Sequence, residues 1–190
     1  MNLAWNALFL LWTLGEIILL LRARTTDNVQ PACSWDRGTL RLLWITLFVS
    51  ITLGQLVRAR LGPTPALHRP AIADAALLLL LVGVLLRGVA IATLGRAFSV
   101  NVAIRASQRI VQHGLYACVR HPSYSALLLI FLAIGLRTAN FYALAVTVFP
   151  PIVALLWRIH VEEIALRASF GDDYDDYARR VPRRLLPGLW

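Results

Sequence analysis

Two pairs of oppositely charged residues stand four positions apart in the carboxyl-terminal part of the chain: Arg158 with Glu162, and Glu163 with Arg167. Residues four apart are neighbours on a helix surface, so the spacing predicts two ion pairs on adjacent faces of one helix. On a water-exposed surface such a pair contributes only about 0.2–1 kcal/mol and is mostly structural. In a less aqueous setting, a guanidinium can hold a carboxylate ligand and a carboxylate can accept a proton. The surroundings of this helix therefore decide between the two interpretations.

A second polar group lies upstream, in the segment from Arg120 to Tyr124. It places a guanidinium, the imidazole of His121 and a phenol around Pro122, which suits the first position of a helix. Free N–H groups at a helix start attract anionic groups. Tyr116 and Tyr124 fit either interfacial anchors or walls for a ligand, and His121 fits either a structural or a binding role. No metal site is predicted, because the remaining histidines lack ligand spacing: His68, His113 and His160.

Composition supplies the setting. The 190 residues are 58% hydrophobic and only 15% charged, which indicates an integral membrane protein with one domain. The net charge of +9 comes from 19 basic residues, all arginine, against 10 acidic ones. A nucleic-acid partner is not predicted, because the arginines stand at the ends of apolar runs and form no continuous stripe. Cys33 and Cys118 form no disulfide or zinc-site pattern.

Five apolar stretches predict an all-helical fold with five transmembrane helices. Their bounds are Leu3–Leu21, Leu42–Val57, Ile72–Leu94, Pro122–Leu136 and Phe141–Trp157. The fourth stretch would cover roughly 22 Å, less than a hydrocarbon core of about 30 Å, so it should begin at the water boundary. Glu16, Asp74 and Arg87 interrupt the apolar stretches, which suits either a polar pathway or pairing between helices.

The last two stretches should form a tight helical hairpin around residues 137–140, with a kink at Pro150 and Pro151. The hairpin brings the two polar groups to one side of the membrane, opposite the amino terminus. We expect that side to be the cytoplasm, because positive residues concentrate there. These arginines are Arg96, Arg105, Arg109, Arg120, Arg158, Arg167, Arg179, Arg180, Arg183 and Arg184. Arg58, Arg60 and Arg69 would then face outward.

The polar groups carry a resemblance to a known family. The chain reads Gly-x-Tyr-x-x-x-Arg-His-Pro-x-Tyr at 114–124, Glu-Glu-x-x-Leu at 162–166, Phe-Gly-x-x-Tyr-x-x-Tyr at 170–177 and Val-Pro-Arg at 181–183. In order and spacing it resembles the isoprenylcysteine carboxyl methyltransferases and the related phospholipid N-methyltransferases. These are integral membrane enzymes that use S-adenosylmethionine.

The resemblance implies an active site in the carboxyl-terminal half, residues 95–190. Residues 1–94 would form three amino-terminal helices. It implies that Arg158 faces the lipophilic methyl acceptor and that Glu162 shares in catalysis and contacts the cofactor. The other cofactor contacts that it implies are Gln108, Ile110, Val111, Tyr116, His121 and Tyr124. Gln108 departs from the His or Lys usual in the family, so backbone contacts by Ile110 and Val111 fit better there.

Several functions stay open at this point. A carboxylate acceptor, methylated as in isoprenylcysteine O-methylation, needs no general base because it is already ionised at neutral pH. A phospholipid amine would need one, and Glu162 or Glu163 could serve. A membrane reductase using a nicotinamide cofactor is a further alternative, although the chain lacks Gly-x-Gly-x-x-Gly. A non-enzymatic membrane module is the last.

Overall fold

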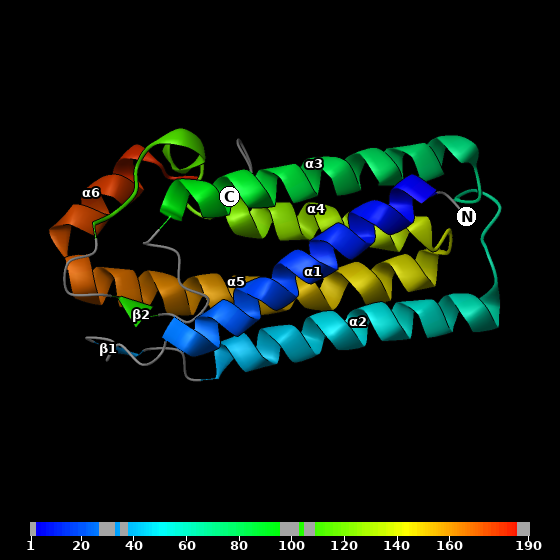
Figure 1. Cartoon of the computed structure of the whole chain (residues 1–190), viewed down its shortest axis with the longest axis horizontal. Coiled ribbons are helices and arrows are strands. Elements are labelled where there is room, and N and C mark those ends of the chain that lie inside the picture. The colour runs from blue at the N-terminus through cyan, green and yellow to red at the C-terminus, as the bar shows by residue number, and fades with distance from the viewer. Residues whose placement is uncertain (1–2, 27–32, 35–37, 96–102, 105–108, 186–190) are drawn as a thin grey trace.

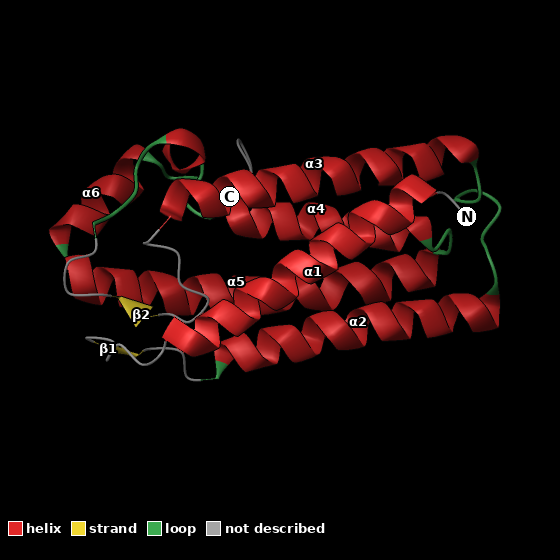
Figure 2. Ribbon diagram, viewed as in Figure 1, coloured by secondary structure: helices red, strands yellow, loops and turns green. Residues whose placement is uncertain are grey.

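The computed structural model describes residues 3–26, 33–34, 38–95, 103–104 and 109–185, which form a bundle of long helices (Figure 1). The elements in chain order are α1 (Leu3–Thr26), β1 (Cys33–Ser34), α2 (Thr39–Leu61), α3 (Pro70–Leu94), β2 (Ala103–Ile104), the 3-10 turn η2 (Gly114–Ala117), α4 (Pro122–Arg137), α5 (Phe141–Phe170) and α6 (Asp172–Arg180). The two strands pair antiparallel, Cys33 opposite Ile104. Helix otherwise dominates the described chain (Figure 2).

In the part of the chain that the structure describes, four helices are long and apolar enough to cross a membrane: α1, α2, α3 and α5. Helix α4 is apolar but shorter, and its 16 residues begin at Pro122 as the sequence predicts. At about 1.5 Å per residue it is about 24 Å long. The all-helical class, with five apolar helices and the last two in a hairpin, is confirmed.

The core is centred on α4, which packs against α3 on one side and α5 on the other, while α2 packs along α5. Leu127, Ile130 and Phe131 of α4 are almost fully buried. The approach of α3 requires a glycine, because a Cβ on Gly83 would lie 2.7 Å from Cγ1 of Ile130. Large apolar side chains on the outer surfaces of the bundle remain exposed, as expected where a protein meets lipid.

The turn between α4 and α5 is held by side-chain hydrogen bonds. Asn140 caps α5, its Oδ1 accepting from the Ala143 N–H at 3.0 Å, and its Nδ2 donates to the Gly62 carbonyl at 2.7 Å. Arg58, at the end of α2, donates to the Arg137 carbonyl at 3.2 Å. Orphan carbonyls at the end of α4 thereby gain partners, which keeps the hairpin tight.

Helix α5 continues as helix through Pro150 and Pro151 and ends at Phe170, beyond the predicted apolar stretch that ends at Trp157. The extension carries the residues of both predicted pairs on one helix, and Glu163 and Arg167 form the predicted contact at 3.8 Å. Gly171 then adopts a φ of 52°, in the left-handed region that favours glycine, and the chain reverses into α6. In Figure 1, α6 and the amino terminus lie at opposite ends of the bundle, as the hairpin predicts.

Candidate active site

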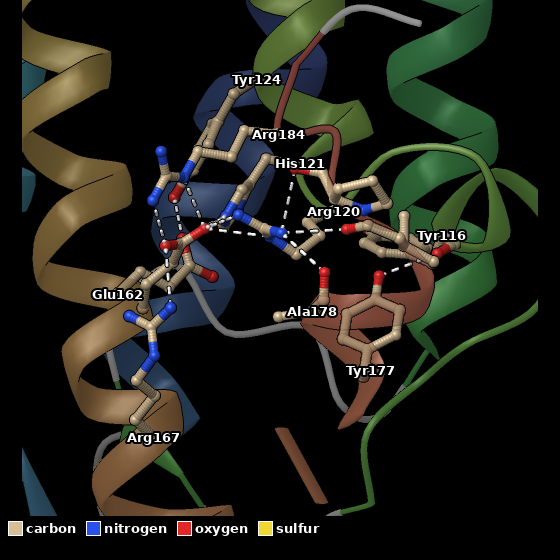
Figure 3. Close-up of polar contacts among 12 residues, drawn as sticks. Tyr116, Arg120, His121, Tyr124, Glu162, Arg167, Tyr177, Ala178 and Arg184 are labelled. Atoms are coloured by element: carbon tan, nitrogen blue, oxygen red, sulfur yellow. Dashed lines mark hydrogen bonds and ion pairs between the residues drawn. The ribbon is translucent and has the colours of Figure 1, made fainter. Parts of the chain in front are cut away.

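The predicted polar groups meet at the α6 end of the bundle. Figure 3 shows Arg120, His121 and Tyr124, from the start of α4, pointing toward the extension of α5 that carries Glu162. The segment after α6 completes the group. The backbone N–H of Arg120 donates to the Arg183 carbonyl, and that of His121 donates to the Arg184 carbonyl, both at 2.9 Å. Three segments of the chain therefore build one site.

Glu163 is the charged centre of this site. Its side chain is 2% exposed, yet three arginines and a histidine surround it. The distances to its carboxylate oxygens are 2.9 Å from Arg120 Nη2, 3.0 Å from Arg184 Nη2, 3.3 Å from His121 Nε2 and 3.8 Å from Arg167 Nη2. A buried carboxylate held by this many donors is a fixed counter-ion and a poor proton acceptor.

Arg120 ties this centre to the end of α6. Its Nε and Nη2 donate to Glu163, while its Nη1 donates to the carbonyls of Val181 at 2.9 Å and Ala178 at 3.3 Å. These carbonyls stand where a helix leaves its acceptors unsatisfied. One buried guanidinium thus fixes α4, α5 and α6 relative to one another.

Tyr124 and Glu162 form a second contact between α4 and α5. The Tyr124 hydroxyl donates to Glu162 Oε2 at 2.8 Å, and His121 Nδ1 lies 3.8 Å from the same oxygen. The imidazole of His121 stacks on the Tyr124 ring with planes 14° apart. Glu162 stays 31% exposed, unlike its buried neighbour Glu163, so it is the carboxylate that a ligand can reach.

Tyr116 and Tyr177 close the other side of the site. The Tyr177 hydroxyl donates to the Tyr116 carbonyl at 2.8 Å, and the Tyr116 hydroxyl donates to the Ala90 carbonyl of α3 at 3.4 Å. Burial raises the pKa of Tyr177 to about 12, although the charge of Arg120 opposes this shift. Burial, and next the negative charge of Glu162, raise the pKa of Tyr116 well above its usual range. Both phenols stay neutral donors at physiological pH.

Arg158 lies one turn of α5 deeper, where it is 3% exposed. Its Nη1 donates to the Thr39 hydroxyl of α2 at 2.6 Å. Together with Tyr124 it lines a cavity of about 40 Å³ whose other walls are mainly leucines. The indole nitrogen of Trp44, in the same wall, is buried and finds no hydrogen-bond partner among the described residues. The cavity therefore combines the guanidiniums of Arg158 and Arg87, the carboxylate of Glu16 and the indole donor of Trp44 with a lining that is mainly leucine.

The structure also shows where the charged residues within the apolar helices lie. Glu16 and Arg87 pair across α1 and α3, so interhelical pairing explains both of them, and both line the cavity. Asp74 is exposed near the start of α3 and does not line it. Among the described residues, no group of three His, Cys, Asp or Glu side chains could hold a metal ion.

The predicted site residues that the structure describes lie close together. Ile110 packs against the cluster of Tyr174, Tyr177 and Val181, and Val111 follows it half-buried. Gln108 lies outside the described residues.

Sequence reasoning missed the roles of Arg184 and of α6. The helix had a readable signal, since Asp172, Asp173 and Asp175 complement its amino end and Arg179 and Arg180 its carboxyl end. The contact of Arg184 with Glu163 had none, because it depends on how the chain folds back after α6.

The fold and site define a class, an intramembrane helical protein whose carboxyl-terminal half builds a polar pocket at one end of the bundle. The family model of the isoprenylcysteine carboxyl methyltransferase (ICMT) family matches residues 76–168, from α3 into the extension of α5. This match covers just under half of the chain and supports the isoprenylcysteine carboxyl methyltransferase family for it.

Individual proteins agree with this assignment. The chain is 31% identical over 112 residues to a probable protein-S-isoprenylcysteine O-methyltransferase of Oryza sativa subsp. indica, covering 55% of this chain and 56% of the relative. It is 42% identical over 78 residues to methanethiol S-methyltransferase 2 of Bradyrhizobium diazoefficiens, covering 40% and 28%. The solved structure of the eukaryotic intramembrane Ras methyltransferase ICMT matches with a TM-score of 0.64 at 26% identity, over 77% of this chain and 52% of that one. The chain spans about half the length of the curated relatives that it matches.

Proposed function

We propose that this protein transfers a methyl group from S-adenosylmethionine to the carboxylate of a lipophilic acceptor. The observation that carries the proposal is the position of Tyr124. Its hydroxyl contacts Glu162 in the polar site, and its side chain lines, together with Arg158, the leucine-walled cavity inside the bundle. A water-soluble cofactor and a lipophilic acceptor can therefore meet at this residue from opposite sides.

The polar site fits the cofactor by its charge and its donors. S-adenosylmethionine carries positive charge on its sulfonium and ammonium groups, and Glu162 offers a reachable carboxylate beside neutral phenols. We assign the cofactor contacts to Tyr116, His121, Tyr124 and Glu162, with the backbone of Ile110 and Val111 and, from the resemblance alone, Gln108. When bound, the cofactor supplies an electrophilic methyl group on sulfur.

The protein's part of the reaction is alignment. Methyl transfer from a sulfonium is an in-line displacement, so the rate depends on holding the two reacting atoms in contact and collinear. The guanidinium of Arg158 would hold the acceptor carboxylate by two hydrogen bonds and aim one oxygen at the methyl group. A carboxylate needs no base at neutral pH.

The geometry favours this acceptor over an amine. An amine must first lose a proton, and the site would have to supply a base. Glu163 is held by Arg120, Arg184 and His121, which makes it a poor base. Glu162 already accepts a hydrogen bond from Tyr124. Methyl transfer to a carboxylate acceptor requires neither Glu162 nor Glu163 to gain or lose a proton.

We also propose that the α6 end of the bundle faces the cytoplasm. Among the described residues, eight arginines lie in η2 and its flanks, the extension of α5, α6 and the following segment: Arg109, Arg120, Arg158, Arg167, Arg179, Arg180, Arg183 and Arg184. Excess positive charge marks the cytoplasmic side. A reporter enzyme that works only in the cytoplasm should be active when it is fused after α6. Activity of a reporter that works only outside the cytoplasm would reverse the assignment.

A methyl-transfer assay tests the function. The purified protein in lipid nanodiscs would receive labelled S-adenosylmethionine together with N-acetyl-S-isoprenylcysteine, its carboxamide, or phosphatidylethanolamine. We expect label in the free acid alone, as a base-labile methyl ester. Label in phosphatidylethanolamine would instead establish an amine acceptor, and absence of label in all three would refute the proposal for these acceptor classes.

A further inference from the structure

Thr39, the first residue of α2, contacts the guanidinium that lines the cavity. Its hydroxyl accepts a hydrogen bond from Arg158 Nη1 at 2.6 Å. Both residues are buried, although both are polar. They lie 119 positions apart in the chain, so this hydrogen bond joins α2 to α5 and depends on how the two helices pack.

The packing of α2 against α5 fixes the position of Thr39. Thr39 begins a stripe of buried residues, spaced three or four apart on one face of α2, that continues with Leu43, Leu47, Ser50 and Gly54. At the far end of the stripe, a Cβ on Gly54 would collide with Thr147 Oγ1 and lie 3.3 Å from the Ala143 carbonyl oxygen. The two helices are therefore in contact along most of α2, and the Thr39 hydroxyl is held beside Arg158 by a packed helix.

Thr39 itself stays outside the cavity. Of the described residues of α2, the cavity is lined by Leu40, Leu43, Trp44 and Leu47, and Thr39 does not line it. Arg158 does line it. A ligand in the cavity would therefore contact the guanidinium, and any effect of the Thr39 hydroxyl on that ligand has to pass through Arg158.

The hydrogen bond determines how the guanidinium is turned. A guanidinium is planar and binds a carboxylate best through two parallel N–H groups. The arginine side chain can rotate about several bonds, so its fork keeps one direction only where other groups hold it. Thr39 holds one end of the fork. Because a hydroxyl is a neutral acceptor, this contact orients the guanidinium without cancelling its positive charge.

We propose that Thr39 is a positioning residue for methyl transfer: its hydroxyl fixes the plane of the Arg158 guanidinium so that the fork faces a carboxylate in the cavity. This inference rests on the proposed function, which gives the acceptor carboxylate to Arg158. The plane of the fork also sets selectivity. A carboxylate accepts two parallel hydrogen bonds, whereas a carboxamide has one oxygen to accept them, so an aligned fork favours the acid.

A purely structural role of Thr39 at the start of α2 makes a different prediction. Valine keeps the size and the branched Cβ of threonine but lacks the hydroxyl, whereas serine keeps the hydroxyl and loses the branch. If Thr39 only packs, Thr39→Val should behave as the wild type. If its hydroxyl positions Arg158, Thr39→Ser should do so instead.

Binding and turnover of the full-length protein in nanodiscs test the inference. The proteins compared would be the wild type, Thr39→Val, Thr39→Ser and Thr52→Val. The last is the matched control, because the Thr52 hydroxyl is exposed on the same helix and donates to the Phe48 carbonyl at 2.9 Å. The measurements are the dissociation constants of S-adenosylmethionine, of labelled N-acetyl-S-isoprenylcysteine and of its carboxamide, together with kcat for the acid.

We expect Thr39→Val to lose about tenfold in its preference for the acid over the carboxamide, the loss of one hydrogen bond to a charged group. Its kcat should fall about tenfold or more, because the acceptor oxygen is no longer aligned with the methyl group. Affinity for S-adenosylmethionine should not change. Thr39→Ser and Thr52→Val should match the wild type. Unchanged selectivity and kcat in Thr39→Val would overturn the inference.

The same change in an Arg158→Lys background shows whether Thr39 acts through Arg158. Lysine has no planar fork to align, so Thr39→Val should then add little to the loss of kcat. A second loss as large as in the wild-type background would show that Thr39 acts by another route, and would overturn the inference. Should Thr39→Val not fold, Thr39→Ala takes its place, and wild-type selectivity in that variant counts equally against a positioning role.

The two proposals fail in different ways. An acid that binds in preference to its carboxamide but is never methylated contradicts the proposed function, and the selectivity of Thr39→Val still decides the role of Thr39. An acid that is methylated equally by the wild type and Thr39→Val, with equal selectivity, contradicts the role of Thr39 alone.

Discussion

Tyr124 of α4 donates its hydroxyl to Glu162 of α5 at 2.8 Å, and this hydrogen bond joins the start of one helix to the polar extension of the next. Tyr124 also lines the cavity that contains Arg158. The contact therefore stands at the boundary between the two halves of the proposed site.

Replacing Tyr124 with Phe should weaken cofactor binding. The change removes a hydrogen bond to a charged group, worth about 1.5–3 kcal/mol, and frees Glu162 to change its orientation. We expect the dissociation constant of S-adenosylmethionine to rise about tenfold or more by isothermal titration. Tyr142→Phe is the matched control, because Tyr142 is 70% exposed on α5. Equal affinity of the two variants for S-adenosylmethionine would show that Tyr124 is not part of the cofactor site.

Replacing Arg158 with Lys should affect the acceptor. Lysine keeps the charge but loses the planar fork that aligns a carboxylate. We expect kcat/KM for the acid to fall about a hundredfold, with cofactor affinity unchanged, in the labelled-methyl assay. Arg60→Lys, at an exposed position on α2, provides the control. A loss confined to cofactor binding would contradict the division of roles.

Replacing Glu163 with Gln should destabilise the fold. The change leaves Arg120 and Arg184 close together without their shared anion. Breaking a buried ion pair from one side costs about 3–5 kcal/mol, and the partial exposure of Arg184 places the expected loss near the lower value. Unfolding in a detergent titration measures it. Asp176→Asn, which loses an exposed pair with Arg179, should change stability by less than about 1 kcal/mol.

Alkaline pH should reveal the burial of Tyr177. Its pKa is about 12 in the folded protein, above the ordinary value of 10.0, so the unfolded chain loses this proton first. Stability should therefore fall as pH rises from 10 to 12, by about 1.4 kcal/mol per unit for this group. Tyr177→Phe should make the fall of unfolding free energy with pH less steep, by the amount that corresponds to the release of one proton. An unchanged slope would show that Tyr177 ionises freely in the fold.

Replacing Gly83 with Ala should separate α3 from α4. The new Cβ would lie 2.7 Å from Ile130 Cγ1 and 3.2 Å from the Ala126 carbonyl oxygen. Overpacking of this kind costs about 1–3 kcal/mol. Gly88→Ala on the same helix meets nothing within 4 Å and should be neutral or slightly stabilising. Thermal unfolding of the two variants compares them directly.

The helices and the pairing of the two polar groups could be predicted because local signals define them. Pro122 marks the start of α4, and the polar turn at 137–140 forces the hairpin, so Tyr124 and Glu162 had to approach each other. The motif spacing pointed to the same residues.

The remaining contacts depend on tertiary structure. Glu16 and Arg87 lie 71 positions apart, and a lone charge on each helix does not reveal which neighbour it meets. The continuation of α5 past Trp157 could be predicted from the four-residue spacing of its charges, but its end at Phe170 could not. Arg184 joins Glu163 only after α6 has turned the chain back.

The shortness of α4 has a consequence for the surrounding lipid. At about 24 Å, this helix is roughly 6 Å shorter than a typical hydrocarbon core, while α2, α3 and α5 are long enough to span it. Because α4 cannot reach both surfaces of such a bilayer, we expect the bilayer to thin beside it so that water reaches His121 and Tyr124. Hydrophobic mismatch thus becomes a control on the site. We expect short-chain lipids to favour entry of the polar cofactor and thick, sterol-rich bilayers to oppose it.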